Sequence, residues 1–215
     1  MDKKPASPAY RRSIFDGIFP KFYDFTANLF TLWQVRRVRR EAINALGIKP
    51  GQKAIDIACG TGEMALLLAE KVGSGGSVIA IDLSQRMIDV AQKKSRSLPQ
   101  LAFSRRDFVR LNHRNSFDAA TIGLAAHEVP DDIRLKMYRE AYRALKKGGK
   151  FLVFDFQWPK NILLKPFFWL FMVIFEPNGF SYAGEDHKKI LESISFKRIY
   201  YKDSLFLETS VYQKP

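Results

Sequence analysis

Short apolar runs alternate with amphipathic stretches over the middle of the chain, from about residue 53 to residue 155. Apolar runs bounded by turn residues are typical of buried strands, and apolar residues at helical spacing between them predict connecting helices. The expected strands are 53–58, 77–82, 101–104, 117–122 and 150–155, and the expected helices are 63–72, 84–95 and 131–146. We expect Gly148-Gly149 to end the last helix. Strands that alternate with helices indicate a parallel sheet covered on both faces.

The N-terminal part follows a different pattern. Residues 1–9 are polar and contain proline, so we expect a disordered tail, and residues 10–48 are expected to form a helical cap. Helical spacing within the cap connects Val35, Val38, Ala42 and Leu46. We expect the arginines among them to face away from this apolar stripe.

The C-terminal part breaks the alternation of strands and helices. An apolar insertion occupies about 157–182, and a polar helix is expected near 184–193. Two further strands, 196–201 and 206–212, are joined by so short a connection that they must pair antiparallel. The predicted fold is therefore a doubly wound α/β domain over 49–215. Its seven-stranded sheet is mostly parallel, with a reversed last strand.

Composition and charge narrow the class of protein. The 215 residues are 47% hydrophobic and 27% charged, which fits one globular domain with a substantial core. The charged start of the chain lacks the pattern of a signal peptide, and the single cysteine, Cys59, suits a reducing cytoplasm. A net charge of +13 favours an anionic surface, either nucleic acid or an acidic membrane. The dense run Arg36, Arg37, Arg39 and Arg40 fits such contact, or equally the solvated face of a helix.

A glycine-rich loop is expected between the first strand and the first of the three helices, with the sequence DIACGTGE over residues 56–63. Glycines at this position let the backbone turn sharply and approach a ligand. The run GTGEMA also satisfies a dinucleotide-binding fingerprint, with Asp82 twenty residues after Gly62. The loop by itself therefore leaves both a nicotinamide enzyme and a methyltransferase open.

Three aspartates distinguish the two possibilities. Asp56, Asp82 and Asp107 fall at or just beyond the ends of the first three strands, the edge where open α/β sheets bind ligands. A carboxylate at the mouth of the loop repels a pyrophosphate but suits a ligand that carries an ammonium and a sulfonium. S-adenosylmethionine has those cations and no phosphate. The alternative for each single aspartate is a cap of the following helix or turn.

The motifs DIACGTGE, VIAIDLSQRMIDVAQKK, FDAATIGLAAHEV and LKKGGKFLVFDF resemble the successive motifs of class I S-adenosylmethionine-dependent methyltransferases. They cover about residues 50–156, and the closing hairpin matches the reversed final strand of that fold. The resemblance is nearest to the ubiquinone/menaquinone-biosynthesis C-methyltransferase group, which also has a Tyr-Asp near its N-terminus, here Tyr23-Asp24.

The resemblance implies a cofactor, S-adenosylmethionine, with S-adenosylhomocysteine as product, and a role for individual residues. Asp56 would lie near the methionine ammonium, Asp82 would bind both ribose hydroxyls, and Asp107 would receive the adenine amino group. The residues that would line the rest of the cofactor are Tyr23, Ala58, Cys59, Gly60, Thr61, Gly62, Leu83, Met87, Phe108 and Gly123. Many relatives have glycine where this chain has Ala58, and we expect Ala58 to avoid a positive φ. Cys59 is expected to supply a small side chain rather than a reactive thiol.

His127, in the segment after the fourth strand, is the candidate catalytic base, because its ordinary pKa is near neutrality. The alternative is that it caps the next helix or packs beneath the cofactor. The same segment lacks the Asn/Asp-Pro-Pro-aromatic signature of adenine-amino methylation. No group of side chains has metal-ligand spacing, so no metal is expected.

The apolar stretch 162–175 is too short and too interrupted to span a membrane. Phe168, Trp169 and Phe171 are candidates for the wall of a lipophilic substrate site, and the stretch could also touch an anionic membrane; the alternative is a helix that only covers the sheet. The sequence thus favours a methyltransferase with a small lipophilic or aromatic acceptor, such as a quinone precursor or a lipid. It is expected in the cytoplasm, with peripheral membrane contact. RNA methylation, for which no RNA-binding appendage is visible, and cofactor binding without catalysis stay open.

Overall fold

The computed structural model describes residues 34–95, 98–176 and 179–215. The expected tail 1–9, most of the helical cap and Tyr23 lie outside these ranges. The strands are β1 (Lys53–Ile57), β2 (Ser77–Asp82), β3 (Leu101–Arg105), β4 (Phe117–Gly123), β5 (Leu145–Phe156), β6 (Lys197–Ser204) and β7 (Leu207–Gln213). The helices are α2 (Gln34–Leu46), α3 (Glu63–Val72), α4 (Gln85–Lys94), α5 (Asp131–Ala144), α6 (Lys165–Phe175), α7 (Gly179–Ala183) and α8 (His187–Ser193). Short 3₁₀ helices are η4 (Phe108–Arg110), η5 (Ala126–Glu128) and η6 (Ile162–Leu164).

All seven strands form one sheet in the order β3-β2-β1-β4-β5-β7-β6. The pairs from β3 to β5 are parallel, whereas β7 runs antiparallel to both of its neighbours. The predicted α/β class, the seven strands and the reversed last strand are thus confirmed. The order reverses direction next to β1, so the carboxyl ends of β1 and β4 border the ligand-binding crevice of this class of sheet.

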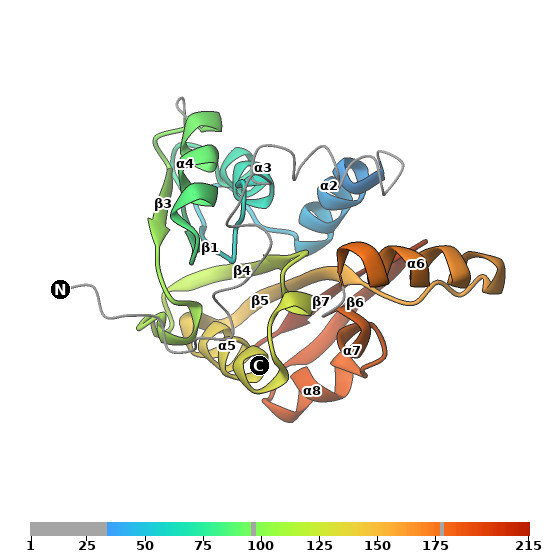
Figure 1. Ribbon diagram of the computed structural model, residues 1–215. Helices are drawn as coiled ribbons and strands as arrows, with labels where there is room; N and C mark the ends of the chain where they lie inside the picture. The colour runs from blue at the N-terminus through green and yellow to red at the C-terminus, as the bar shows by residue number, and fades with distance from the viewer. Residues whose placement is uncertain (1–33, 96–97, 177–178) are drawn as a thin grey trace.

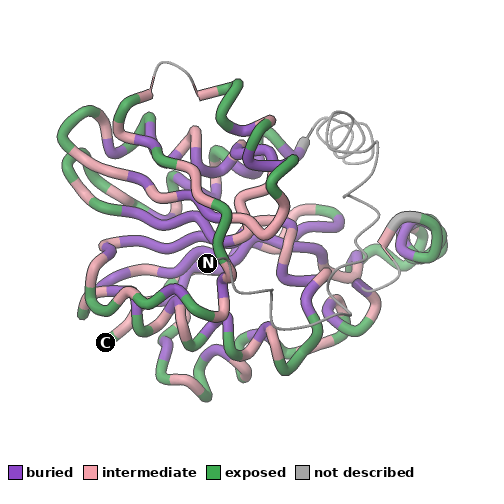
Figure 2. The backbone as a smooth tube through the Cα atoms, turned by 60° about the vertical axis from the view of Figure 1, so that its left-hand side comes forward, coloured by how far each residue is buried: buried purple, intermediate pink, exposed green. Residues whose placement is uncertain are grey.

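Helices cover both faces of the sheet (Figure 1). On one face α2 and α3 pack their apolar sides on the strands through residues such as Ile43, Leu46 and Leu68. On the other face α5 and α8 pack through Met137, Tyr138 and Leu191. The buried residues follow the strands through the middle of the molecule, and exposed residues lie on the outer sides of the helices (Figure 2).

A third, aromatic cluster forms at the end of β5, around Phe154 and Phe156. It joins Val35 and Val38 of α2 to Phe168 and Met172 of α6. In Figure 1 helix α6 extends outward beside the β6–β7 end of the sheet. No helix within the described ranges has both the length and the apolar character needed to cross a bilayer.

The end of α5 differs from the prediction. The helix stops at Ala144 instead of continuing to the glycine pair, and Leu145 is already extended, with ψ 141°. Leu145 is fully buried and pairs with Phe117 of β4, so sheet pairing ends the helix. Gly148, with φ 77°, instead lies within a stretch where the β4–β5 register shifts.

Candidate functional site

The glycine-rich loop turns sharply between β1 and α3. Ala58, Gly60 and Gly62 all have positive φ, at 55°, 53° and 85°. A Cβ on Gly62 would lie 3.0 Å from that of Ala91, so glycine is needed there for packing as well as for conformation. Beside Gly60 there is nothing within 4 Å of the Cβ position, which leaves open space against the loop.

The expectation that Ala58 avoids a positive φ is wrong. An L-residue in the left-handed region costs about 1–2 kcal/mol, because its Cβ approaches the following carbonyl. The loop imposes this conformation because its neighbours are fixed: the Cys59 amide donates to the Ile81 carbonyl at 2.9 Å, and the Gly62 amide donates to the Cys59 carbonyl at 2.9 Å.

Asp82, the last residue of β2, holds the loop in place. Its Oδ2 accepts a hydrogen bond from the Gly60 amide at 2.8 Å, and its Oδ1 accepts one from the Ser84 amide at 2.8 Å. The carboxylate therefore ties the glycine loop to the start of α4.

Asp56 is buried inside β1, between the glycine loop and β4. Thr121 donates to its Oδ1 at 2.6 Å, whereas Oδ2 has no hydrogen-bond partner within the described ranges. Burial raises the pKa of Asp56 to about 7, against the hydrogen bond from Thr121, and the nearby charge of Asp82 raises it further. A cationic ligand beside Oδ2 would satisfy this oxygen and favour the ionised form.

The other residues expected to line the cofactor lie around the same edge of the sheet. Leu83 is half-buried after β2, and Met87 is buried in the first turn of α4. Asp107 caps η4, accepting from the Val109 amide at 3.1 Å, as the alternative interpretation of this aspartate expected. Thr61 and Phe108 are also buried, and Gly123 is the last residue of β4.

Cys59 has no activated thiol. Burial raises its pKa well above the ordinary value, and the charges of Asp56 and Asp82 raise it further. The thiol therefore stays protonated at neutral pH, and it makes a long contact of 3.8 Å with the Gly60 carbonyl. This fits the expectation of a small side chain rather than a nucleophile.

His127 lies in η5, directly after the end of β4, and is buried. Its Nδ1 is 2.6 Å from Oδ1 of Asp155 near the end of β5, and its Nε2 is 3.3 Å from Oε2 of Glu176 after α6. Oδ2 of Asp155 also accepts from the amides of Ala126, at 2.8 Å, and His127, at 3.2 Å. Asp155 therefore fixes both the η5 backbone and the histidine ring.

The pKa of His127 is raised well above its ordinary value. Burial lowers it, but the Asp155 carboxylate and then Glu176 outweigh that effect. The pKa of the neighbouring Glu128 is raised to about 8, chiefly by burial, with His127 opposing. The negative charges of Glu176, Asp82 and Asp155 raise the pKa of Glu128 further.

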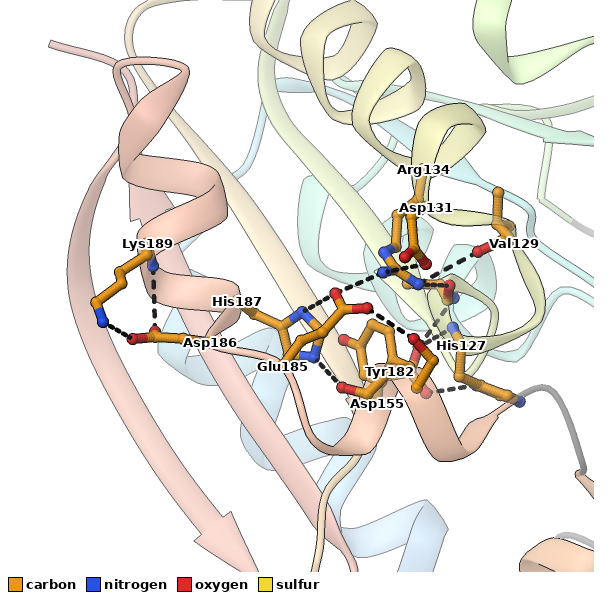
Figure 3. A network of polar contacts seen from close by, with 12 residues as sticks. His127, Val129, Asp131, Arg134, Asp155, Tyr182, Glu185, Asp186, His187 and Lys189 are labelled. Carbon is orange, nitrogen blue, oxygen red and sulfur yellow. Dashed lines mark hydrogen bonds and ion pairs between the residues drawn. The ribbon is translucent and has the colours of Figure 1, made fainter.

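Arg134 of α5 holds the backbone at both ends of η5, through the Ala126 and Val129 carbonyls (Figure 3). Its guanidinium donates to the Val129 carbonyl at 3.2 Å and pairs with Asp131 and with Glu185. It also lies over the Tyr182 ring, 5.1 Å from the centroid, and Tyr182 in turn stacks on His187. Arg134 is thus a buried connection between η5 and the α7–α8 region.

Ligand atoms of His127, Glu128 and Glu176 lie within 4.8 Å of one another. These three side chains form a group of potential metal ligands that the spacing of residues along the sequence does not show. Glu176 is 49 residues from His127, so no spacing in the sequence could reveal the group. That no metal is bound stays a prediction.

The three candidate substrate-site residues of α6, Phe168, Trp169 and Phe171, lie in two different environments. Phe168 is fully buried and stacks on Phe206, with 5.2 Å between the ring centroids. Phe171 packs against Phe156, with 5.6 Å between the ring centroids. Phe156 also contacts the His127 ring at 4.8 Å, so the aromatic cluster reaches the histidine. Trp169 instead is 52% exposed.

The arginines of α2 do not all face away from the apolar stripe, contrary to the prediction. Arg36, Arg37 and Arg40 are exposed, but Arg39 is buried. Arg39 follows Val35 by four residues and precedes Ala42 by three, so helical spacing puts it on the apolar face. Sequence reasoning missed this arginine, and it also missed Thr121, Arg134, Asp155 and Glu176. An acidic residue inside the apolar run FLVFDF was a visible signal for Asp155.

Known proteins resemble this chain in both sequence and fold. Residues 4–196 match the model of the ubiE/COQ5 methyltransferase family. A demethylmenaquinone methyltransferase of Staphylococcus epidermidis is 31% identical over 90% of this chain and 80% of its own length. A 2-phytyl-1,4-naphtoquinone methyltransferase of Nostoc sp. is 35% identical over 73% of this chain and 69% of its own. A SAM-dependent methyltransferase from Aquifex aeolicus shares the fold, with a TM-score of 0.67 at 18% identity over 82% of this chain and 89% of that protein.

Proposed function

This chain belongs to the ubiE/COQ5 methyltransferase family and is an S-adenosylmethionine-dependent methyltransferase, and from this premise we propose that it methylates a lipophilic quinone precursor. The observation that carries the proposal is the buried His127, held between Asp155 and Glu176 and joined through Phe156 to an aromatic cluster. A proton acceptor beside apolar surface suits an aromatic, hydroxylated acceptor. The names of the relatives from Staphylococcus epidermidis and Nostoc sp. support a naphthoquinone-type ring.

The residues at the sheet edge suit the cofactor. S-adenosylmethionine, when bound, supplies an electrophilic methyl group. Asp82, whose carboxylate lies between the glycine loop and the start of α4, would accept hydrogen bonds from its ribose hydroxyls. The unpartnered Oδ2 of Asp56 would accept from the ammonium, and the open space beside Gly60 gives a ligand room to approach the backbone. Leu83 and Met87 would pack against the ribose and adenine, with Asp107, Phe108 and, from outside the described ranges, Tyr23 completing the site.

His127 would act on the acceptor as a base. A ring carbon becomes nucleophilic when a neighbouring hydroxyl loses its proton, and Nε2 of neutral His127 would accept that proton. Asp155 fixes the ring by its contact with Nδ1 and stabilises the imidazolium that forms. Burial of the cluster excludes water from the reacting groups.

We also infer that no metal takes part. In the protonated form that Asp155 and Glu176 favour, His127 has no free lone pair with which to bind a metal ion.

Contact with an anionic membrane belongs to the same proposal. Seven of the exposed large apolar side chains lie in η6 and α6: Ile162, Leu163, Phe167, Trp169, Leu170, Val173 and Ile174. An apolar patch of this kind on one element marks an interaction site. Lys165 in the first turn of α6 and the exposed arginines of α2 add positive charge, which favours a cytoplasmic, anionic leaflet. A lipophilic acceptor would be taken from that leaflet.

The test is turnover by the purified protein. Incubation with S-adenosylmethionine and a reduced 2-alkyl-1,4-naphthoquinone should yield S-adenosylhomocysteine and an acceptor heavier by one methylene unit in mass spectrometry. Dialysis against EDTA should leave the rate unchanged. Product formed only with RNA would overturn the acceptor class, and cofactor binding without turnover on any acceptor would indicate a binding protein.

A further inference from the structure

Arg39 is a buried cation for which the described residues provide no hydrogen-bond or ion-pair partner. Only 5% of the residue is exposed, although Arg36, Arg37 and Arg40 on the same helix face solvent. No hydrogen bond or ion pair joins its guanidinium to any other residue in the described part of the chain. Burying a charge without a partner is costly, so an anion within reach of this guanidinium would stabilise it.

The place of Arg39 in the fold indicates which anion. Helix α2 packs beside α3, whose first turn follows the glycine loop, with Ile43 and Leu46 in the same apolar cluster as Met64 (Figure 1). Arg39 also acts electrostatically on Asp56 without forming an ion pair with it. The guanidinium and the Asp56 carboxyl, whose Oδ2 has no partner among the described residues, therefore influence each other without a direct ion pair.

We propose that Arg39 binds the α-carboxylate of the methionine part of S-adenosylmethionine, beside the Asp56 carboxyl that receives the adjacent ammonium. The inference rests on the proposed cofactor site and names a further residue of it. An amino-acid zwitterion carries its ammonium and carboxylate on one carbon, so its binding site needs an acid and a base side by side. A guanidinium suits the carboxylate of this zwitterion, because its planar donors can form two parallel hydrogen bonds with the two carboxylate oxygens.

Three ligands separate this role from a structural one. S-adenosylhomocysteine carries both the carboxylate and the ammonium of the amino-acid part. Decarboxylated S-adenosylmethionine keeps the ammonium but has no carboxylate, and 5′-methylthioadenosine has neither group. Arg39→Gln should weaken S-adenosylhomocysteine binding in calorimetry by about 10- to 100-fold, the range for losing a hydrogen bond between charged groups. Binding of the other two ligands should change by less than about twofold. Arg39→Lys should recover part of the loss, because it keeps the charge but not the bidentate geometry.

Arg40→Gln is the matched control, because it removes the same charge one residue along the helix from an exposed position. It should leave the affinity for all three ligands unchanged. Equal weakening of all three ligands by Arg39→Gln would assign Arg39 a structural role and overturn the proposal, and so would unchanged binding of S-adenosylhomocysteine.

The wild-type protein provides a test that does not depend on the folding of a variant. It should bind decarboxylated S-adenosylmethionine at least tenfold more weakly than S-adenosylmethionine, and equal affinities would overturn the proposal. If the wild type bound none of these adenosyl ligands, the cofactor site itself would be refuted, which is a different result from a failure of Arg39 alone.

Discussion

Individual carboxylates at the ends of the strands differ in what their oxygens already bind. Asp82 accepts two backbone amides, and Asp155 accepts three and a histidine, so both organise loops as well as any ligand. Asp56 accepts from Thr121, is influenced by the Ala65 amide, and keeps one oxygen, Oδ2, without a hydrogen-bond partner among the described residues. The first two residues therefore combine a structural task with the proposed functional one, whereas Asp56 has binding capacity that the protein itself leaves unused.

Replacement of Asp82 tests its double task. Asp82→Ala should weaken binding of S-adenosylhomocysteine by about 2–4 kcal/mol, because the ribose contacts and the fixed position of Gly60 are both lost. Asp82→Asn should cost less, because the amide keeps one acceptor oxygen. Calorimetry measures both, with Asp89→Ala, an exposed aspartate of α4, as the control. Wild-type affinity in Asp82→Ala would contradict the assignment of this residue to the ribose.

The pH dependence of turnover tests His127. A base must be neutral to accept a proton, and the pKa of His127 is raised well above its ordinary value, so the rate should increase with pH through that raised pKa. Glu176→Gln removes the negative charge beside Nε2 of His127 and should lower the pKa of His127, so the rise in rate should move to lower pH. The measurement is kcat/KM against pH.

Glu192→Gln, an exposed glutamate of α8, is the control and should leave the profile unchanged. A profile of Glu176→Gln that stays in place or moves to higher pH would argue against His127 as the base. Full activity of His127→Ala would exclude that role altogether.

Helices and strands show which parts of the fold their own sequences determine. The strands were predictable because each is an apolar run between turn residues, and α3 begins and ends as expected. The end of α5 was not predictable, because the burial of Leu145 and its pairing with Phe117 decide it, and neither is visible in the local pattern. Arg39 was predictable from helical spacing, whereas Glu176 reaches His127 only through the path of the chain after α6.

In the candidate site, too, some residues could be identified from the sequence and others could not. The residues at the glycine loop and at the ends of β1 and β2 could be identified because strand order alone brings them to one edge. The positive φ of Ala58 could not, since the loop's hydrogen bonds to Ile81 and within itself impose it against the preference of alanine. The partners of His127 likewise depend on β5 and on the insertion lying against η5.

Helix α6 is expected to bind an anionic membrane through its exposed apolar side chains. The protein should sediment with vesicles that contain phosphatidylglycerol, and Leu163→Ser combined with Trp169→Ser should reduce binding by about tenfold or more, because two large side chains that would enter the bilayer are lost. Ile199→Ser, which removes an exposed apolar side chain from β6, is the matched control. Equal sedimentation of the double variant and the wild type would contradict contact through α6, and equal binding to neutral vesicles would contradict the electrostatic part.

At the scale of the whole molecule, cofactor binding and folding are coupled. The proposed cofactor site is formed by residues of β1, β2 and the glycine loop, together with Arg39 of α2. A ligand that binds there therefore contacts several elements at once and stabilises them together. A ligand that binds only the folded state adds RT ln(1 + [L]/Kd), about 2.7 kcal/mol at a concentration 100 times Kd. For a chain of 215 residues this corresponds to an increase in melting temperature of about 5–10 °C.

S-adenosylhomocysteine should therefore raise the melting temperature in a thermal-shift assay, whereas NAD should not. The buried Asp56 carboxyl at the loop disfavours a pyrophosphate, and ionisation of Asp56 strengthens that effect as the pH rises through about 7. Any stabilisation by NAD should accordingly be smallest at pH 8. Stabilisation by NAD equal to that by S-adenosylhomocysteine at pH 8 would contradict the discrimination attributed to Asp56. It would also mean that the glycine loop alone, and not the carboxylates around it, selects the ligand.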